Sequence, residues 1–235
     1  MDVTPIARIA VSDAVYSRLA EQILSGRVPA GEPLPSEREL ALAFGVNRHA
    51  IREALKRLQQ AGLVRISHGG KTRALDWRAS VGLDALGALV AAGVIPPRTV
   101  IRDVAVMRRT IGADAARLCA LEADAGQLDA VSEAAAAYPD TGPQPGAQFH
   151  ELAVADLAFW TAVVEGSGNI AYRLALNTLV TAIDDLGVGT VHELGAGEFT
   201  DRRGHLRLAE LIVARDGDAA FRQAHQLLSH LVSAI

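Results

Sequence analysis

The stretch that decides the fold of the N-terminal part begins Pro35-Ser36-Glu37-Arg38-Glu39-Leu40 and continues Phe44-Gly45-Val46-Asn47-Arg48-His49-Ala50-Ile51-Arg52. Ser36 followed three residues later by Glu39 has the spacing of a capping box, which predicts the start of a helix. Gly45 stands where that helix must end, and Asn47 can cap a second helix. The sequence therefore predicts two short helices joined by a tight turn, which is a helix-turn-helix.

Basic side chains occupy the first exposed positions of the second predicted helix. Arg48, His49 and Arg52 lie there, away from the apolar positions Ile51 and Leu55. A recognition helix that enters the major groove by its N-terminal end needs hydrogen-bond donors at these places, and Arg grips guanine edges or phosphates with two hydrogen bonds. The alternative explanation is that any short helix pair carries surface arginines.

A hairpin directly after these helices strengthens the DNA-binding interpretation. Residues 63–67 alternate apolar and polar side chains, Gly69-Gly70 is typical of a tight turn, and residues 72–75 supply the returning strand. The sequence thus predicts a winged helix-turn-helix. Its wing tip carries His68 and Lys71, both able to donate to phosphates or to a minor groove.

Residues 12–75 resemble the N-terminal domain of the GntR regulators, through Gly31-Glu32-Pro33-Leu34-Pro35-Ser36-Glu37-Arg38-Glu39-Leu40, Gly45-Val46-Asn47-Arg48 and Ile51-Arg52-Glu53-Ala54-Leu55. Residues 66–72 and 77–83 look most like the FadR branch of that family. The resemblance implies that Arg38, Arg48 and Arg52 contact DNA and that His68 reaches the minor groove. The predicted DNA-binding residues are Arg38, Asn47, Arg48, His49, Arg52, His68, Gly69 and Lys71.

The charge distribution agrees with a nucleic-acid partner for the N-terminal part. Residues 1–76 carry 11 Lys and Arg against 8 Asp and Glu, whereas the remainder carries 12 against 19. An asymmetry of this kind assigns nucleic acid to the positive half. The single cysteine fits a reducing compartment, and no signal peptide or membrane-spanning stretch is recognisable. We therefore expect a cytoplasmic protein that does not contact membranes.

The rest of the chain reads as helix, so the predicted fold class is mainly α: a winged helix-turn-helix with a small β-hairpin wing, then an all-α helical bundle. We expect domains at 1–76 and 81–235, joined by a linker at 77–80. The predicted helices are 81–92, 97–122, 125–137, 147–165, 169–186, 198–215 and 218–234. This region resembles the effector-binding domain of the FadR branch, through Met107-Arg108, Asp156-Leu157-Ala158-Phe159 and Gly166-Ser167-Gly168-Asn169.

Three polar side chains fall on apolar helix stripes of the predicted bundle. Asp156, His205 and His225 each lie among apolar neighbours at helical spacing, and a carboxylate that faces a core needs a partner. One Asp and two His are a plausible set of ligands for a divalent metal such as Zn. The alternative for each His is an ordinary core residue.

The family resemblance bears on this set. Many members hold a metal with one Asp and three His, and Asp156, His205 and His225 occupy three of those positions. The fourth position is Trp160, which cannot bind a metal and resembles the aromatic residue of the acyl-CoA-binding members. Arg108 matches a position where the family places an effector-contacting Arg, although a salt-bridged helix residue is the plainer explanation. Arg108, Asp156, Trp160, His205 and His225 are therefore the predicted effector site.

The leading functional hypothesis is a homodimeric transcription regulator, and not an enzyme. It would bind a palindromic DNA operator under the control of a small effector, with a fatty acyl-CoA or related lipid ranked first. A small carboxylate metabolite bound through a metal is the alternative. A metal-dependent hydrolase with a nucleic-acid-binding domain is remote, because the sequence offers no evident general base. An architectural DNA-binding protein would need an interior without the polar residues named above.

Overall fold

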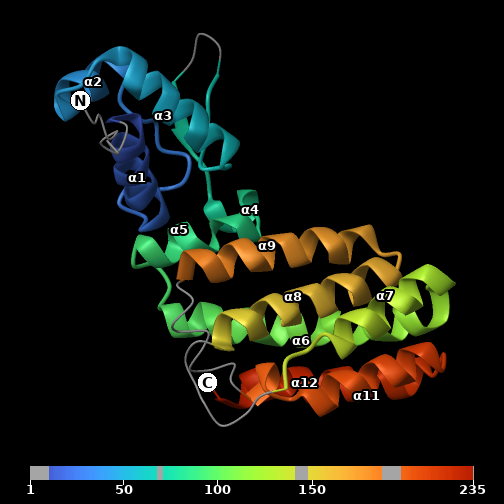
Figure 1. The fold of residues 1–235 in the computed structure, drawn as a ribbon. Helices are drawn as coiled ribbons and strands as arrows, with labels where there is room; N and C mark the ends of the chain where they lie inside the picture. Colours follow the sequence, from blue (N-terminus) through green and yellow to red (C-terminus); the bar gives the residue numbers. More distant parts are fainter. Residues whose placement is uncertain (1–10, 68–70, 141–147, 187–196, 235) are drawn as a thin grey trace, which may run out of the picture. The chain divides into compact units, whose positions relative to one another are not determined.

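The computed structural model describes residues 11–67, 71–140, 148–186 and 197–234. The fold is mainly helical with one small antiparallel hairpin, which confirms the predicted fold class (Figure 1). The chain divides into two compact units between Pro96 and Pro97, each with its own hydrophobic core. Among the described residues, no helix combines the length and the apolar character that a membrane span requires.

The N-terminal unit is a winged helix-turn-helix. Its elements are α1 (Val11–Leu24), α2 (Glu37–Phe44), α3 (Arg48–Gln60), β1 (Val64–Arg65) and β2 (Arg73–Ala74). The strands pair with Val64 opposite Ala74 and Arg65 opposite Arg73, which keeps the first pair buried and the second exposed. The core lies between α1, α3 and the hairpin, where Ile51, Ala54 and Leu58 are fully enclosed.

Local signals account for the helix-turn-helix geometry. Ser36 and Glu39 form both hydrogen bonds of the predicted capping box at the start of α2. Gly45 ends α2 with φ of 66° and ψ of 32°, a left-handed conformation that glycine adopts without strain. The turn is thus set by residues within a few positions of it.

The N-terminal unit extends further along the chain than the predicted linker at 77–80. Those residues form α4 (Trp77–Ser80), followed by a 3-10 turn (Leu83–Ala85) and α5 (Leu86–Ala91). Trp77, Val81 and Leu89 pack on the N-terminal core. Gly62 permits this packing, because a Cβ there would lie 2.5 Å from the Ser80 carbonyl oxygen. The 81–92 segment is therefore two shorter pieces that belong to the first unit.

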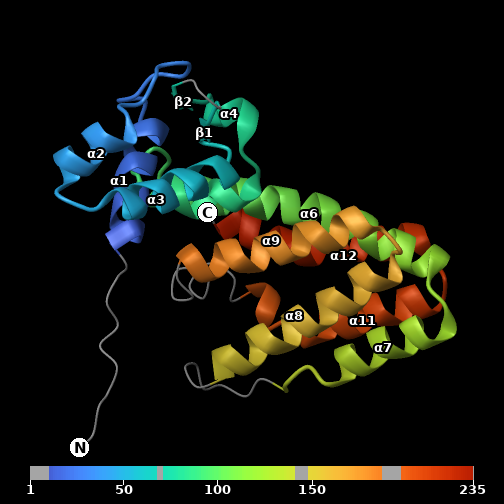
Figure 2. The ribbon, with the colours of Figure 1, turned by 90° about the horizontal axis from the view of Figure 1, so that it is seen from above.

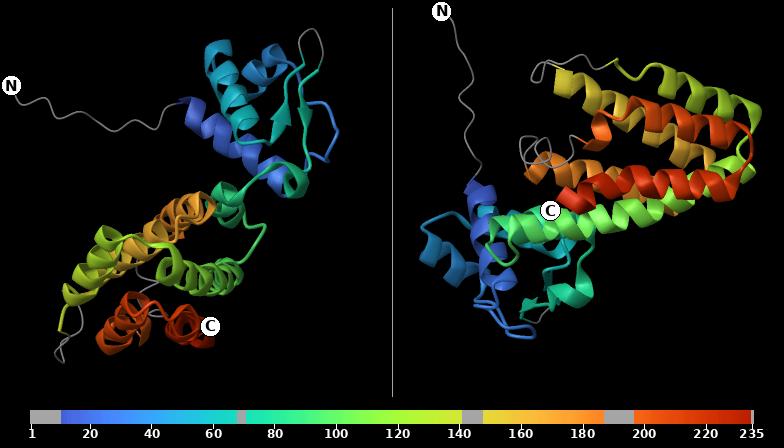
Figure 3. Two further views of the ribbon diagram at one scale, coloured as in Figure 1. Left: turned by 90° about the vertical axis from the view of Figure 1, so that its right-hand side faces the viewer. Right: turned by 90° about the horizontal axis from the view of Figure 1, so that it is seen from below.

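The C-terminal unit is a helical bundle of α6 (Pro97–Glu122), α7 (Ala125–Ala136), α8 (Gln148–Gly166), α9 (Ile170–Leu186), α11 (Arg202–Val213) and α12 (Gly217–Ala234). Helices α6, α7 and α8 lie between α9 on one side and the pair α11 and α12 on the other (Figures 1 and 3). The core is dominated by small residues of α6 and by apolar side chains of α8, α11 and α12. The central helix α6 contacts each of α8, α9, α11 and α12.

Candidate functional site

The N-terminal end of α3 carries the predicted DNA-reading side chains. Arg48, His49 and Arg52 are exposed on its first turns, as is Arg38 on α2. Asn47 caps α3 by accepting a hydrogen bond from the backbone N–H of Ala50 at 2.8 Å. Its side chain therefore has a structural partner in the free protein, whereas the basic residues project into solvent.

Arg52 is held by an acidic residue of the preceding helix. Its Nη2 donates to Oε2 of Glu37 at 3.1 Å, and its Nε lies 3.4 Å from Oε1 of the same carboxylate. Both side chains are more than one third exposed, so the pair lies in high dielectric and contributes little to stability. The pair holds the Arg52 guanidinium of α3 beside Glu37 of α2.

The wing is described only in part. Lys71 is exposed, and Arg73 on β2 donates from Nη1 to the backbone carbonyl of Gly31 at 2.8 Å. The predicted tip residues His68 and Gly69 lie outside the described residues.

A buried ionic cluster occupies the interior of the C-terminal unit, and Arg108 of α6 lies at its centre. Nη2 of Arg108 donates to Oδ2 of Asp156 on α8 at 2.9 Å. Nη1 donates to Oε2 of Glu198, in the helical residues before α11, at 2.6 Å. Asp156 is 6% exposed and Glu198 is fully buried. One cation therefore serves two buried carboxylates, which leaves the set one negative charge in excess when both are ionised.

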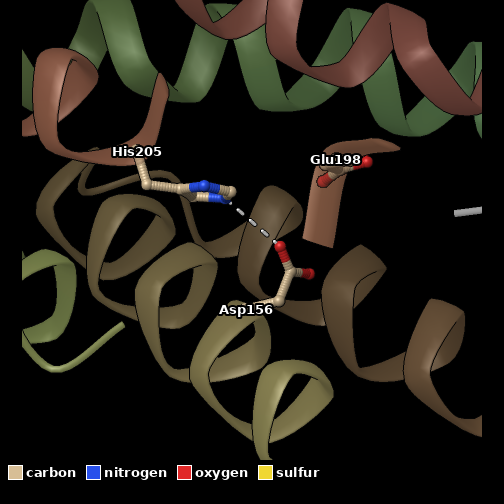
Figure 4. A group of neighbouring side chains, drawn as sticks. All are labelled: Asp156, Glu198 and His205. Carbon is tan, nitrogen blue, oxygen red and sulfur yellow. Dashed lines mark ion pairs between the residues drawn. The ribbon is translucent and has the colours of Figure 1, made fainter. Parts of the chain in front are cut away.

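His205 completes the cluster from α11 (Figure 4). Its Nδ1 lies 2.8 Å from the backbone carbonyl oxygen of Asp201, and since a carbonyl only accepts, Nδ1 carries the proton. Nε2 then faces Oδ1 of Asp156 at 3.4 Å with a lone pair when the ring is neutral. A proton or a metal ion on Nε2 would remove this repulsion.

Tyr138 supports the same carboxylate from the end of α7. Its hydroxyl donates to Oδ1 of Asp156 at 3.0 Å, and its ring stacks on His205 with centroids 4.0 Å apart. Burial raises the pKa of the Tyr138 hydroxyl, and the Asp156 charge adds to the shift, so Tyr138 stays a donor.

The two carboxylates have opposite pKa shifts. Burial alone would raise the pKa of Asp156, but the Arg108 charge, the neighbouring His205 and the hydrogen bond from Tyr138 lower it below its ordinary value. Burial raises the pKa of Glu198, and Arg108 opposes that rise only in part. Asp156 is therefore the ionised partner of Arg108, and Glu198 is the residue that most readily holds a proton.

His225 lies apart from this cluster in the structure, and its role as a ligand stays a prediction. The buried face of α12 is formed by Ala220, Ala224, Leu227, Leu228 and Leu231. His225 follows Ala224 by one residue, a rotation of about 100° around the helix. Its ring is exposed and stacks on Phe221 at a centroid distance of 6.2 Å.

Glu198 and Tyr138 take part in the cluster although the sequence reading missed them. Glu198 precedes His205 by seven residues, but α11 begins only at Arg202, so helical spacing does not relate the two side chains. Tyr138 begins a loop and has no periodic pattern to identify it. Both residues meet Asp156 or Arg108 only through the tertiary fold.

An apolar cavity of about 20 Å³ adjoins the cluster. Its lining residues come from α6, α8, α9 and α12, and they are Arg108, Ile111, Gly112, Trp160, Val164, Tyr172, Leu176, Leu179 and Leu228. Arg108 is the charged member of this set. Trp160 is 3% exposed, and its Nε1 has no acceptor among the described residues. A buried indole N–H normally finds an acceptor, so this unpaired donor is an exception in the interior of the unit.

Three donor side chains of the cluster meet the geometric requirement of a metal site. Ligand atoms of Asp156, Glu198 and His205 lie within 4.8 Å of one another. Oε1 of Glu198 and Nε2 of His205 are buried without a hydrogen-bond partner among the described residues. Two carboxylates and an imidazole whose other nitrogen is fixed by a backbone carbonyl suit a divalent ion. The residues present therefore fit a metal, with Glu198 in the place predicted for His225.

Comparisons with known proteins agree with this two-part architecture. Residues 11–73 match the family model "Bacterial regulatory proteins, gntR family", and residues 103–230 match the FCD domain. The HTH-type transcriptional regulator Mce2R of Mycobacterium tuberculosis is 34% identical over 231 residues, covering 97% of this chain and 92% of that protein.

Two further relatives are more partial or more distant. A fatty acid metabolism regulator protein of Vibrio vulnificus is 36% identical over 93 residues, which is 40% of this chain and 33% of that protein. The solved structure titled "Lar controls the expression of the Listeria monocytogenes agr system and mediates virulence" matches with a TM-score of 0.51 at 18% identity, covering 98% of each chain, which shows the fold alone. From the two family matches and the full-length relative, the chain belongs to the GntR family of DNA-binding transcription regulators, with an FCD domain as its C-terminal part.

Proposed function

We propose that this regulator binds a palindromic operator as a homodimer and that a fatty acyl-CoA or related lipid, bound in the FCD domain, controls its affinity for DNA. The observation that carries the choice of effector is the apolar cavity with Arg108 at its border. A ligand with a hydrocarbon chain and a polar head matches a mostly apolar pocket that has one charged side chain, Arg108, in its lining.

The cavity must enlarge to take a long chain, since drug-sized ligands occupy roughly 300–1,000 Å³. Helix α9 is the wall best suited to move. It contributes Tyr172, Leu176 and Leu179 to the lining, and it packs within the unit against α6 and α8. Its outward side exposes Ile170 and Leu174, at 70% and 58%. Displacing α9 therefore breaks fewer buried contacts than displacing α12, which packs along α6.

The lipid would control DNA binding because the two binding equilibria are coupled. If the lipid binds the operator-bound form less tightly than the free form, DNA must weaken lipid binding by the same factor. The test is operator binding by the full chain at increasing palmitoyl-CoA, with coenzyme A alone as the matched control. We expect palmitoyl-CoA to release the operator at micromolar concentration and coenzyme A to have no effect. Release by neither compound would contradict the lipid as effector.

The second candidate effector is a small carboxylate held through a divalent metal. It is favoured by the two unpaired buried atoms, Oε1 of Glu198 and Nε2 of His205, beside Asp156. A bound metal would supply positive charge to this set and an open position for the effector's carboxylate. Asp156, Glu198 and His205 would hold it.

The two candidates make opposite forecasts. For the metal, dialysis against a chelator lowers the melting temperature of the wild type, because a ligand that binds only the folded state stabilises it. The His205→Ala protein would then melt at the same temperature with and without chelator. For the lipid, chelation leaves both the melting temperature and the release by palmitoyl-CoA unchanged. Metal analysis of the purified wild type separates the two directly.

A further inference from the structure

Gly112 lies in the middle of α6, one helical turn after Arg108, and both residues line the apolar cavity. Glycine inside a helix is less favourable than alanine by about 1 kcal/mol, because it has more backbone freedom to lose on folding. A glycine in the long central helix of a bundle therefore has a local packing reason.

The space around Gly112 identifies that reason. A Cβ at this position would lie 2.5 Å from Cδ1 of Leu228 on α12 and 3.4 Å from Cζ3 of Trp160 on α8. Both neighbours are cavity-lining residues that are almost completely buried. The missing side chain is thus what lets Leu228 and Trp160 approach α6 at the wall of the cavity.

The cavity has a polar end and an apolar remainder. Its lining includes Arg108 and Gly112 on α6 and Trp160 and Val164 on α8, each pair four residues apart. Four residues of helix span about 6 Å, so the present cavity covers about one turn of each helix. Arg108 also belongs to the ionic cluster, and Gly112 lies one turn further along the same wall of the cavity.

We propose that Gly112 sets how long a hydrocarbon chain the FCD domain accepts, with Leu228 as the side chain that closes the pocket opposite it. This inference rests on the lipid effector proposed above and names the residue that selects among lipids. A methyl group at position 112 would meet Leu228 and Trp160 and push these two lining side chains toward the cavity, which leaves less room for a chain. Truncation of Leu228 would enlarge the cavity instead.

A simpler role for Gly112 is close packing of α6 against α12, without any ligand. Gly166 provides the matched control. It is also a buried helical glycine, and a Cβ there would likewise lie 2.5 Å from a side-chain atom, Sγ of Cys119. Gly166 does not line the cavity. The two alanine variants thus impose similar crowding, at the pocket in one case and away from it in the other.

The experiment measures the affinity of the full chain for saturated acyl-CoA esters from butanoyl to stearoyl, without DNA, for wild type, Gly112→Ala, Gly166→Ala and Leu228→Val. We expect Gly112→Ala to lose about tenfold or more in affinity for the longest chains, while retaining the shortest, because one added methyl in a tight pocket has an effect of this size. Gly166→Ala should keep the wild-type chain preference, and Leu228→Val should shift the preference toward longer chains.

The outcomes separate this inference from the proposed function. If wild type binds acyl-CoA and Gly112→Ala shows the same chain preference as Gly166→Ala, Gly112 is a packing residue and the inference is wrong, while the lipid effector stands. If wild type binds no acyl-CoA of any length, the proposed effector and this inference fail together. Should Gly112→Ala not fold, an unchanged chain preference in Leu228→Val overturns the inference by itself.

Discussion

At the scale of single residues, Arg52 is a side chain predicted to read DNA that is already oriented in the protein without DNA. The Glu37 carboxylate accepts two contacts from the Arg52 guanidinium. These contacts restrict the rotamers of the long Arg52 side chain. An arginine already oriented loses less conformational entropy when it meets a base or a phosphate. The acidic partner also repels phosphates, so it favours correct sites over DNA in general.

We predict that Glu37→Gln tightens binding to non-operator DNA and reduces the ratio of operator to non-operator affinity, since one negative charge is lost and Arg52 is released. Arg52→Ala should lower operator affinity by about 1–3 kcal/mol. Titrations against both DNAs at several salt concentrations measure these effects. Glu53→Gln removes the same charge from α3, where Glu53 pairs with Lys56. Equal effects of Glu37→Gln and Glu53→Gln would mean that charge alone matters.

Glu198 gives a pH prediction. Burial raises its pKa above the ordinary 4.5, so the stability it contributes is complete below that pH and is lost as the pH rises through the higher folded value. Glu198→Gln keeps the shape and does not titrate. We therefore expect the stability of Glu198→Gln, relative to wild type, to increase as the pH rises above about 5 in chelator-treated protein.

Asp156 serves as a control, because its contribution to stability should change with pH in the opposite direction to that of Glu198. Its pKa is lowered, so its contribution is present above the ordinary 3.8 and is lost as the pH falls through the folded value. Asp156→Asn should consequently be destabilised most at neutral pH and least in acid. Urea unfolding from about pH 2 to about pH 8 measures both variants. Parallel curves for wild type and Glu198→Gln would contradict the assignment of the proton.

At the scale of elements, the start of α3 holds a helix cap and side chains predicted to contact DNA within three residues of each other. Asn47 satisfies the Ala50 N–H, which fixes the direction in which Arg48 and Arg52 leave the helix. The same residue was predicted to contact DNA, and that part remains a prediction. Different substitutions of Asn47 can therefore test the stability of α3 and the recognition of DNA separately.

We predict that Asn47→Ala lowers the free energy of unfolding of the N-terminal unit by about 1 kcal/mol, because it removes the cap. Asn47→Asp should retain the cap and the stability. If Asn47 also lies near phosphates in the complex, Asn47→Asp will weaken operator binding through charge repulsion. Thermal unfolding and operator titration of both variants measure the two effects, and equal operator affinity of Asn47→Asp and wild type would limit Asn47 to capping.

At the scale of the whole molecule, the chain consists of two units with separate hydrophobic cores. Figure 2 shows the helices of both units. The predicted DNA-reading side chains belong to the first unit, and the ionic cluster with its cavity belongs to the second. A ligand in the cavity therefore stabilises the second unit directly.

We expect palmitoyl-CoA at a hundredfold excess over its dissociation constant to stabilise the helical unit by about 2.7 kcal/mol. Calorimetry of the full chain should show this as a higher unfolding temperature of that unit. The transition of the N-terminal unit should stay in place, and a short operator duplex should shift that one instead. A single transition that both ligands move together would mean that the two units unfold as one.

The sequence alone determined the features that depend on near neighbours. The capping box, the left-handed Gly45 and the Asn47 cap each involve residues within three or four positions, so the helix-turn-helix was predictable in detail. Helical periodicity identified the all-α C-terminal part and placed Asp156 and His205 inside it.

Only the tertiary structure decided what surrounds Asp156. Arg108 and Glu198 are 90 residues apart, and Tyr138 begins a loop without a pattern, so no local signal joins them. His225 lies outside the buried face of α12 because one residue turns a side chain by about 100°, and only the packing of α12 on α6 fixes which face is buried. The spacing of apolar residues predicts that a helix has a buried face. Which side chains meet on that face depends on how the helices pack.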